Sequence, residues 1–333
     1  MVVPGSIPRI ILSSTIIMNS TFEKLKVQKS LLWLVKFLVF VFVLYQLVKR
    51  LQKISLDDFS SLAIVKPIYI IIAMTLVFVN WGIEALKWYL TIRKIGFKTS
   101  NSRIVQSLLS GISTGLITPN RIGNFIGRML YFKPKKRALV VLGTLYGNLA
   151  QFIATVFFGM IGLYFIKNNS IQFEYSDTLI VLSIFLTTLA VLIYFSYPFI
   201  WLTNIPILRS KANIIQLFRQ SAKRLVIPLL ILSGCRYLVF ILQFALLLIG
   251  FGAMFSHELI YSLFVLYLVS TLTPTLILGK LVVRETLAVL ILGTIIFNPV
   301  IILAASFSLW LINLGFPAVV GLYFFLKPKT TEE

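Results

Sequence analysis

Long apolar segments alternate with short polar connectors along most of this chain. A helix that crosses a bilayer needs about 20 mainly apolar residues, with a range of roughly 17–25. Segments of this kind predict about six full spans: Leu31–Val48, Pro67–Leu90, Ala138–Ile166, Thr178–Trp201, Val226–Gly250 and Val300–Leu326. Asn298-Pro299 marks a predicted break directly before the last span. We therefore expect an all-α polytopic membrane protein.

A further apolar region is interrupted at Thr118-Pro119-Asn120-Arg121-Ile122-Gly123. The run before it, Leu108–Ile117, is too short to cross a bilayer. Pro119 removes a backbone donor and Gly123 loosens the backbone. Lipid offers unpaired backbone groups no partner, so such a break must be buried in protein or line a wet cavity. We predict a re-entrant hairpin that turns at Pro119 and Gly123.

The same order of residues returns in Thr273–Glu285, with Thr-Pro, then glycine, then a cation, then an apolar run. Here Pro274 and Gly279 mark the predicted turn. Paired broken segments in two halves of a membrane protein indicate a transporter binding site. Two alternatives stay open: both breaks are ordinary helix–loop–helix junctions, or Leu259–Leu278 and Thr286–Phe297 cross fully, although the latter is short.

The basic residues predict the orientation of the chain. Lys and Arg number 31 against 10 Asp and Glu, for a net charge of +21. They lie in short runs between apolar segments, as the positive-inside rule expects, and not in a nucleic-acid-binding pattern. Arg93–Arg103, Lys133–Arg137 and Arg209–Arg224 are therefore placed in the cytosol, and Lys167–Asp177 outside. This predicts a multi-pass protein of the inner (cytoplasmic) membrane with both termini in the cytosol.

This orientation makes the two hairpins enter from opposite sides, which is an inverted-topology repeat. The expected organisation is a cytosolic segment 1–30, a transmembrane domain 31–326 with repeat units 67–166 and 226–326, and a cytosolic tail 327–333. Residues 1–17, before Met18, are a candidate start-site artefact. The connector Arg209–Arg224 is interpreted as an amphipathic helix on the inner surface, with a solvated loop as the alternative.

The sequence argues against most catalytic chemistry. Cys235 is the only cysteine and His257 the only histidine, so cysteine or histidine metal clusters and Ser-His catalysis are not expected. No Walker loop, Rossmann fingerprint or metal motif is present. We expect no enzyme, no cofactor and no metal.

Polar residues at membrane depth form the candidate substrate site. An intramembrane charge is costly and marks a functional site by default. The candidates are Arg121, Arg128, Arg236, Lys280, Arg284, Glu285, Asn148 and Glu84. Arginine suits phosphate because its planar fork binds two oxygens at once. We predict that Arg121, Arg128, Arg236, Arg284 and Glu285 converge on one cavity near the midplane. In the alternative interpretation, Glu84 and Lys87 form an interface ion pair, and Asn148 and Gln151 hold helices together.

The two interrupted segments resemble a known family. Thr118-Pro119-Asn120-Arg121-Ile122-Gly123-Asn124 is similar to the Thr-Pro-Gly-Arg-x-Gly-Glu signature of the lysylphosphatidylglycerol synthase transmembrane (flippase-like) family. Gly279-Lys280-Leu281-Val282-Val283-Arg284-Glu285 is similar to its Gly-Gly-Leu-Gly-Val-Arg-Glu signature. This sequence has Asn120, Asn124, Lys280 and Val282 where the signatures have Gly, Glu, Gly and Gly.

The resemblance, which covers roughly Leu31–Leu326, implies a membrane domain that translocates lipids or accompanies lipid-modifying enzymes. The synthase domain of that family is separate, and we do not expect it here. The leading hypothesis is a flippase for an anionic or zwitterionic phospholipid or a polyprenyl-phosphate carrier. The alternatives are a membrane-embedded partner of a separately encoded glycosyltransferase or lipid-modifying enzyme, and an intramembrane enzyme that uses carboxylates.

Overall fold

The computed structural model describes residues 62–118, 121–168, 176–195, 212–273 and 279–326, together with Val41 and Tyr45. All the regular secondary structure in these residues is helical, which confirms the predicted all-α class. Several predictions fall outside the described residues: segments 1–30 and 327–333, the span Leu31–Val48 apart from Val41 and Tyr45, Pro119, Asn120, Pro274, and the side chain of Lys280.

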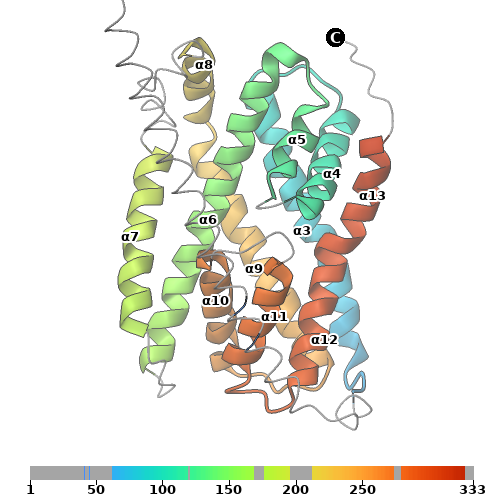
Figure 1. Ribbon diagram of the computed structural model, residues 1–333, viewed down its shortest axis with the longest axis vertical. Coiled ribbons are helices and arrows are strands. Elements are labelled where there is room, and N and C mark those ends of the chain that lie inside the picture. The colour runs from blue at the N-terminus through green and yellow to red at the C-terminus, as the bar shows by residue number, and fades with distance from the viewer. Residues whose placement is uncertain are drawn as a thin grey trace, which may run out of the picture.

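The helices lie side by side along the long axis of the molecule (Figure 1). In chain order they are α3 (Pro67–Lys94), α4 (Asn101–Ile117), α5 (Gly123–Met129), η2 (Pro134–Lys136), α6 (Arg137–Asn168), α7 (Ser176–Phe195), α8 (Ala212–Ala222), α9 (Val226–Gly250), α10 (His257–Leu272), α11 (Gly279–Leu292), α12 (Pro299–Trp310), η5 (Leu311–Gly315) and α13 (Phe316–Leu326). Figure 1 shows α4 and α5 in the upper half of the molecule and α10 and α11 in the lower half.

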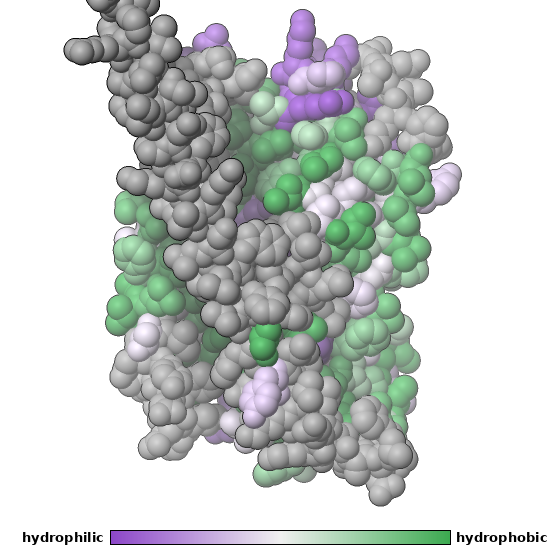
Figure 2. All heavy atoms as spheres, in the orientation of Figure 1, coloured by the Kyte–Doolittle hydropathy of each residue, from purple (hydrophilic) through white to green (hydrophobic). Residues whose placement is uncertain are grey.

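Four helical segments are long and apolar enough to cross a membrane: Pro67–Lys94, Pro134–Ile166, Val226–Gly250 and Pro299–Leu326. Large apolar side chains such as Phe78, Val319 and Tyr323 are exposed on them, and Figure 2 shows apolar residues along the sides of the molecule. An apolar surface of this extent is typical of contact with lipid. These features indicate a multi-pass membrane protein.

Where the described residues include them, the ends of the predicted spans agree with the helices to within four residues. Trp201, the predicted end of the fourth span, lies outside the described residues. The span Val226–Gly250 has the bounds of α9, and the predicted break at Asn298-Pro299 is confirmed. There the Asn298 side chain accepts a hydrogen bond from the backbone N–H of Val300 at 2.9 Å and caps α12. The amphipathic helix predicted within Arg209–Arg224 is also present as α8, whose Phe218 is buried against Tyr146 of α6.

The last span contains a feature that the sequence interpretation missed. Leu311–Gly315 forms a π-helix between α12 and α13. Within it the Asn313 side chain accepts a hydrogen bond from the Asn80 amide of α3 at 2.5 Å. The Asn80 amide also contacts Gln243 of α9 at 3.4 Å. π-helical turns are rare overall, and those that occur inside α-helices are frequently found at functional sites.

Helices flank both predicted turns. α4 ends at Ile117 and α5 begins at Gly123, and these two helices pack against each other, so the chain reverses between them. α10 ends at Leu272, α11 begins at Gly279, and this pair is also in contact. The described residues thus contain no continuous helix through either predicted turn.

The most extensive contacts between distant helices join α3 to α9, α6 to α10 and α4 to α13. Glycines allow the last two pairs to approach closely. A Cβ atom at Gly162 of α6 would lie 2.7 Å from Phe264 Cβ of α10. A Cβ atom at Gly321 of α13 would overlap the backbone carbonyl of Leu109 in α4. These three pairs determine where the two interrupted segments lie relative to the long helices.

Candidate functional site

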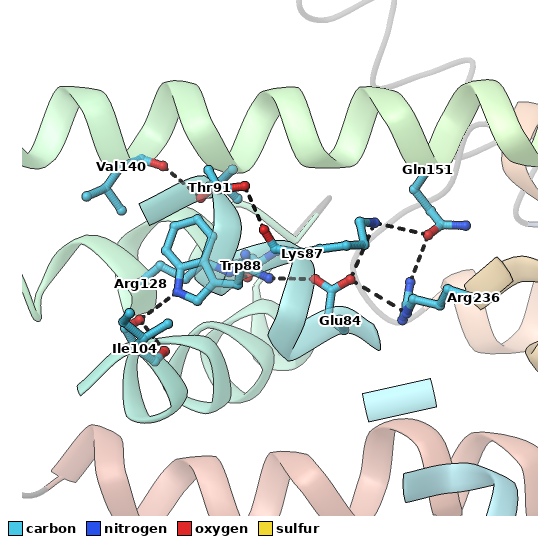
Figure 3. Close-up of polar contacts among 12 residues, drawn as sticks. Glu84, Lys87, Trp88, Thr91, Ile104, Arg128, Val140, Gln151 and Arg236 are labelled. Atoms are coloured by element: carbon cyan, nitrogen blue, oxygen red, sulfur yellow. Dashed lines mark hydrogen bonds and ion pairs between the residues drawn. The ribbon is translucent and has the colours of Figure 1, made fainter. Parts of the chain in front are cut away.

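Glu84 of α3 lies among cations from three helices (Figure 3). Its Oε1 is 3.1 Å from Nη2 of Arg128 on α5. Its Oε2 is 3.5 Å from Nζ of Lys87 on α3 and 3.6 Å from Nε of Arg236 on α9. The side chains of Lys87 and Arg128 are only 5% and 6% exposed, whereas that of Arg236 is 32% exposed. One carboxylate therefore stands against three cations, one of which remains accessible.

Three side chains, Asn124, Trp88 and Glu84, hold the guanidinium of Arg128 in place. Its Nε donates a hydrogen bond to Oδ1 of Asn124, one turn earlier on α5, at 2.9 Å. Its guanidinium carbon lies 4.4 Å from the centroid of the Trp88 ring, close enough for a cation–π interaction. The Trp88 indole N–H in turn donates to the Ser107 hydroxyl of α4 at 2.8 Å. These contacts fix the guanidinium and leave Glu84 as its only acidic partner among the described residues.

Gln151 of α6 joins two of these cations from the side opposite Glu84 (Figure 3). Its Oε1 accepts from Lys87 Nζ at 3.3 Å and from Arg236 Nη1 at 3.2 Å. Its Nε2 donates to the backbone carbonyl of Ser233 on α9 at 3.3 Å. The amide positions both cations without neutralising either, because it carries no charge. We refer to Glu84, Lys87, Arg128, Gln151 and Arg236 as the Glu84 network.

Arg121 occupies the turn between α4 and α5 in an unusual backbone conformation. Its φ is 58°, the only positive value at a non-glycine residue in the described part of the chain. This left-handed region costs an L-residue about 1–2 kcal/mol. Such backbone strain concentrates at functional sites. Arg121 is exposed, yet it lies within electrostatic range of Glu84, Arg236 and Arg284. Charges of the Glu84 network and of α11 therefore both act on Arg121.

Small residues and hydroxyl groups bring α4 and α5 together behind this turn. The Thr118 hydroxyl accepts from the Gly123 N–H at 2.7 Å and donates to the Thr114 carbonyl at 2.7 Å. The Thr114 hydroxyl lies 2.6 Å from the Gly123 carbonyl. A Cβ atom at Gly127 would overlap the Ser110 carbonyl. The two helices approach backbone to backbone, which sets the positions from which Arg121 and Arg128 extend.

Arg284 and Glu285 form a second buried cluster on α11. Nη2 of Arg284 contacts Oε1 of Glu285 and also donates to the Ser306 carbonyl of α12 at 3.3 Å. Tyr267 of α10 lies within electrostatic range of both charges. Four buried polar atoms of this cluster have no hydrogen-bond partner among the described residues: Nε of Arg284, Oε2 of Glu285, and the hydroxyl oxygens of Tyr267 and Ser306. Buried polar groups are normally paired, so each calls for an explanation.

The structure brings the predicted site residues together in two groups and leaves one of them, Asn148, outside both. Glu84, Arg128 and Arg236 are in direct contact, Arg284 and Glu285 form the second cluster, and Arg121 is within electrostatic range of both groups. Gly123 and Gly279 are the first residues of α5 and α11. Asn148 is exposed on α6 and lies outside the Glu84 network.

Sequence reasoning did not select two members of the Glu84 network as site residues. Lys87 does form the predicted ion pair with Glu84, and Gln151 does bond to a neighbouring helix. A purely structural role was one of the interpretations left open for each, and the structure shows that they also contact Arg236 or Glu84. The available signal was their depth, since a lysine and an amide within long apolar helices are costly unless paired.

The charges of the two clusters do not balance. Together they hold two carboxylates, Glu84 and Glu285, and four cations, Lys87, Arg128, Arg236 and Arg284. The exposed Arg121, within electrostatic range of both clusters, raises the excess to three positive charges. The described residues contain no group of three or more His, Cys, Asp or Glu that would suit a metal ion. The arrangement therefore favours an anionic ligand.

Comparison with known proteins gives no match to any family model, any curated protein or any solved structure. What this site binds must therefore be inferred from its own residues and their contacts.

Proposed function

We propose that this chain is an integral membrane lipid transporter or flippase, which binds an anionic or zwitterionic lipid head group between its two interrupted segments. The observation that carries the proposal is the excess of positive charge around Glu84 and Arg121. Buried cations remain stable only when they share water, counter-charges or a bound anion. A phosphate would supply the missing negative charge, and Arg121 and Arg236 retain the exposure needed to reach it. The substrate class is a phospholipid or a polyprenyl-phosphate carrier.

The helix contacts support an inverted-topology repeat for this function. If units 67–166 and 226–326 are equivalent, α3 corresponds to α9, α4 to α10, and α6 to α12–α13. The contact of α6 with α10 then has a symmetry-related counterpart in the contact of α4 with α13. Both α4–α5 and α10–α11 would be re-entrant hairpins, added to about six full spans. Such repeats permit alternating access to a central site.

The basic surface supports the orientation proposed for the protein. Lys98, Lys133, Lys135 and Lys136 are exposed on the connectors around α4 and α5, and polar residues gather at the upper end in Figure 2. By the positive-inside rule, we propose that this end faces the cytosol and that the protein lies in the inner (cytoplasmic) membrane. The resemblance of Thr118–Asn124 and Gly279–Glu285 to the flippase-like signatures is consistent with a lipid substrate.

The test is lipid binding and transport by charge-removing variants. Arg121→Gln and Arg236→Gln should each weaken binding of a short-chain phosphatidylglycerol about tenfold or more, since each removes a charge-assisted hydrogen bond. Arg236→Lys should also weaken binding if the contact is bidentate. Binding would be measured by calorimetry in an uncharged detergent, and scrambling of a fluorescent phosphatidylglycerol in proteoliposomes would report transport.

Lys135→Gln is the matched control, because it removes an exposed cation from outside the site. Folded Arg121→Gln and Arg236→Gln variants with the lipid affinity and transport rate of the wild type would overturn the proposal. Absence of transport, together with stoichiometric capture of a glycosyltransferase or lipid-modifying enzyme, would instead favour the role of a membrane-embedded partner.

A further inference from the structure

The second cluster, at Arg284 and Glu285, differs chemically from the Glu84 network. The Glu285 side chain is 9% exposed, and Arg284 is its only cationic partner among the described residues. One carboxylate oxygen contacts Arg284, while the other is buried without a hydrogen bond. A buried carboxylate that loses its single counter-charge becomes neutral by binding a proton, because burying an unpaired charge is far more costly.

A bound phosphate would compete with Glu285 for the guanidinium of Arg284. Its guanidinium carries five N–H donors, and its Nε is unpartnered among the described residues. It lies within electrostatic range of Arg121, which is exposed at the turn between α4 and α5. A phosphate bound by Arg121 would attract the second guanidinium, since arginine forks prefer a doubly hydrogen-bonded oxyanion.

We propose that Glu285 is a proton-binding site coupled to the lipid head group. The inference rests on the proposed function and adds its coupling ion. When a phosphate draws Arg284 away, the Glu285 carboxylate takes one proton from solvent and becomes a neutral carboxylic acid, while Arg284 keeps its charge. When the lipid leaves, Arg284 returns and the proton is released. Substrate and proton then bind together, which is the requirement for proton-coupled transport.

The surroundings of Glu285 suit a neutral carboxylic acid. α11 packs against α10 and α12. α10 presents the Tyr267 hydroxyl, which has no described partner and is able to accept the new O–H. α12 has no titratable residue and offers the Ser306 hydroxyl, also unpartnered in the described part of the chain.

The other charged and titratable groups nearby are few. Tyr237 of α9 lies within electrostatic range of Tyr267, and its hydroxyl is likewise buried without a described partner. Arg121 acts on Arg284 from the α4–α5 turn. On α10, His257 and Glu258 lie in the first turn, more than two turns from Tyr267, and Tyr261 stacks on Phe165 of α6. Among the described residues around Glu285, no other carboxylate could therefore bind the proton in its place.

The experiment counts protons during lipid binding. Short-chain phosphatidylglycerol is titrated into the purified full chain in an uncharged detergent, in two buffers of different ionisation enthalpy. Wild-type protein should take up about one proton per lipid bound, and by linkage its affinity should rise as pH falls. Glu285→Gln should still bind the lipid, with no proton uptake and an affinity that no longer varies with pH. Glu258→Gln, the matched control, should behave as the wild type.

The outcomes separate the two proposals. Lipid binding by the wild type without proton uptake would overturn the coupling site and leave the proposed function standing. Proton uptake that persists in Glu285→Gln would do the same, and so would binding that depends on sodium instead of pH. If the wild type fails to bind the lipid at all, the proposed function itself is wrong. The wild-type proton count does not depend on any variant, so misfolding of Glu285→Gln would not obscure the result.

Discussion

The two carboxylates of the candidate site, Glu84 and Glu285, differ in how many cations surround them. Glu84 has three cationic neighbours on α3, α5 and α9, and those cations are themselves held by Asn124, Trp88 and Gln151. Glu285 has one cation on its own helix, and four buried polar atoms in its cluster have no described partner. The first region is a connected network with surplus charge, in which one buried atom, Nε of Arg236, lacks a hydrogen-bond partner in the described part of the chain. The second is an incompletely satisfied cluster, which is the expected state of a group that changes partners.

The largest expected effect comes from removing Glu84. Glu84→Gln leaves Lys87, Arg128 and Arg236 without a carboxylate, and breaking a buried ion pair typically costs about 3–5 kcal/mol. Glu285→Gln should cost less, because it removes the counter-charge of one cation, Arg284, and not of three. Thermal unfolding in detergent would compare the two variants with Glu258→Gln as the control. Equal losses for Glu84→Gln and Glu285→Gln would contradict the contrast between the two regions.

The next effect concerns the close packing of α4 on α5. Gly127→Ala places a Cβ atom onto the Ser110 carbonyl, and such overpacking typically costs about 1–3 kcal/mol. Gly147→Ala in α6 is the matched control, since a Cβ atom there meets nothing within 4 Å. Because Arg128 extends from α5, Gly127→Ala should also weaken phosphatidylglycerol binding. If its unfolding temperature and lipid affinity match those of Gly147→Ala, the rigid-scaffold interpretation is wrong.

The smallest stability effect, at Arg121, should have the opposite sign. Arg121→Gly relieves a positive φ and should stabilise the fold by up to about 1 kcal/mol, while removing a cation within electrostatic range of both clusters. Arg121→Gln keeps the strained backbone and removes only the charge. Both variants should lose lipid affinity, but only Arg121→Gly should unfold at a higher temperature. A stabilised variant that binds lipid normally would show that the strain has no functional purpose.

The positions of the helices could be predicted from the sequence because they depend on residues close to one another in the chain. Apolar length and polar connectors located α3, α6 and α9, and Asn298-Pro299 marked the start of α12. Thr-Pro and glycine located both interruptions, and an i,i+3 spacing predicted the Glu84–Lys87 ion pair.

The composition of the site depended on distances between helices, which no periodicity encodes. Arg128 and Arg236 meet Glu84 only because α5 and α9 both approach α3. The same packing separates Arg284 and Glu285 into their own cluster, a division that the sequence did not reveal. Gln151 illustrates the limit well, since its polarity within an apolar span signalled a contact but not its two cationic partners.

The π-helix at Leu311–Gly315 gives the last helix two different faces. A π turn inserts one residue relative to α-helical spacing, and one residue corresponds to about 100° of rotation. The side of α12 that meets α9 and α11 is thus rotated out of line with the side of α13 that meets α4. Without the extra residue, an unbroken helix would present Gly321 away from Leu109. One inserted residue therefore lets the α12–α13 segment pack against α9 and α11 with one face and against α4 with another. A deletion or insertion in Leu311–Gly315 should consequently disturb this packing as much as a substitution at the contacts would.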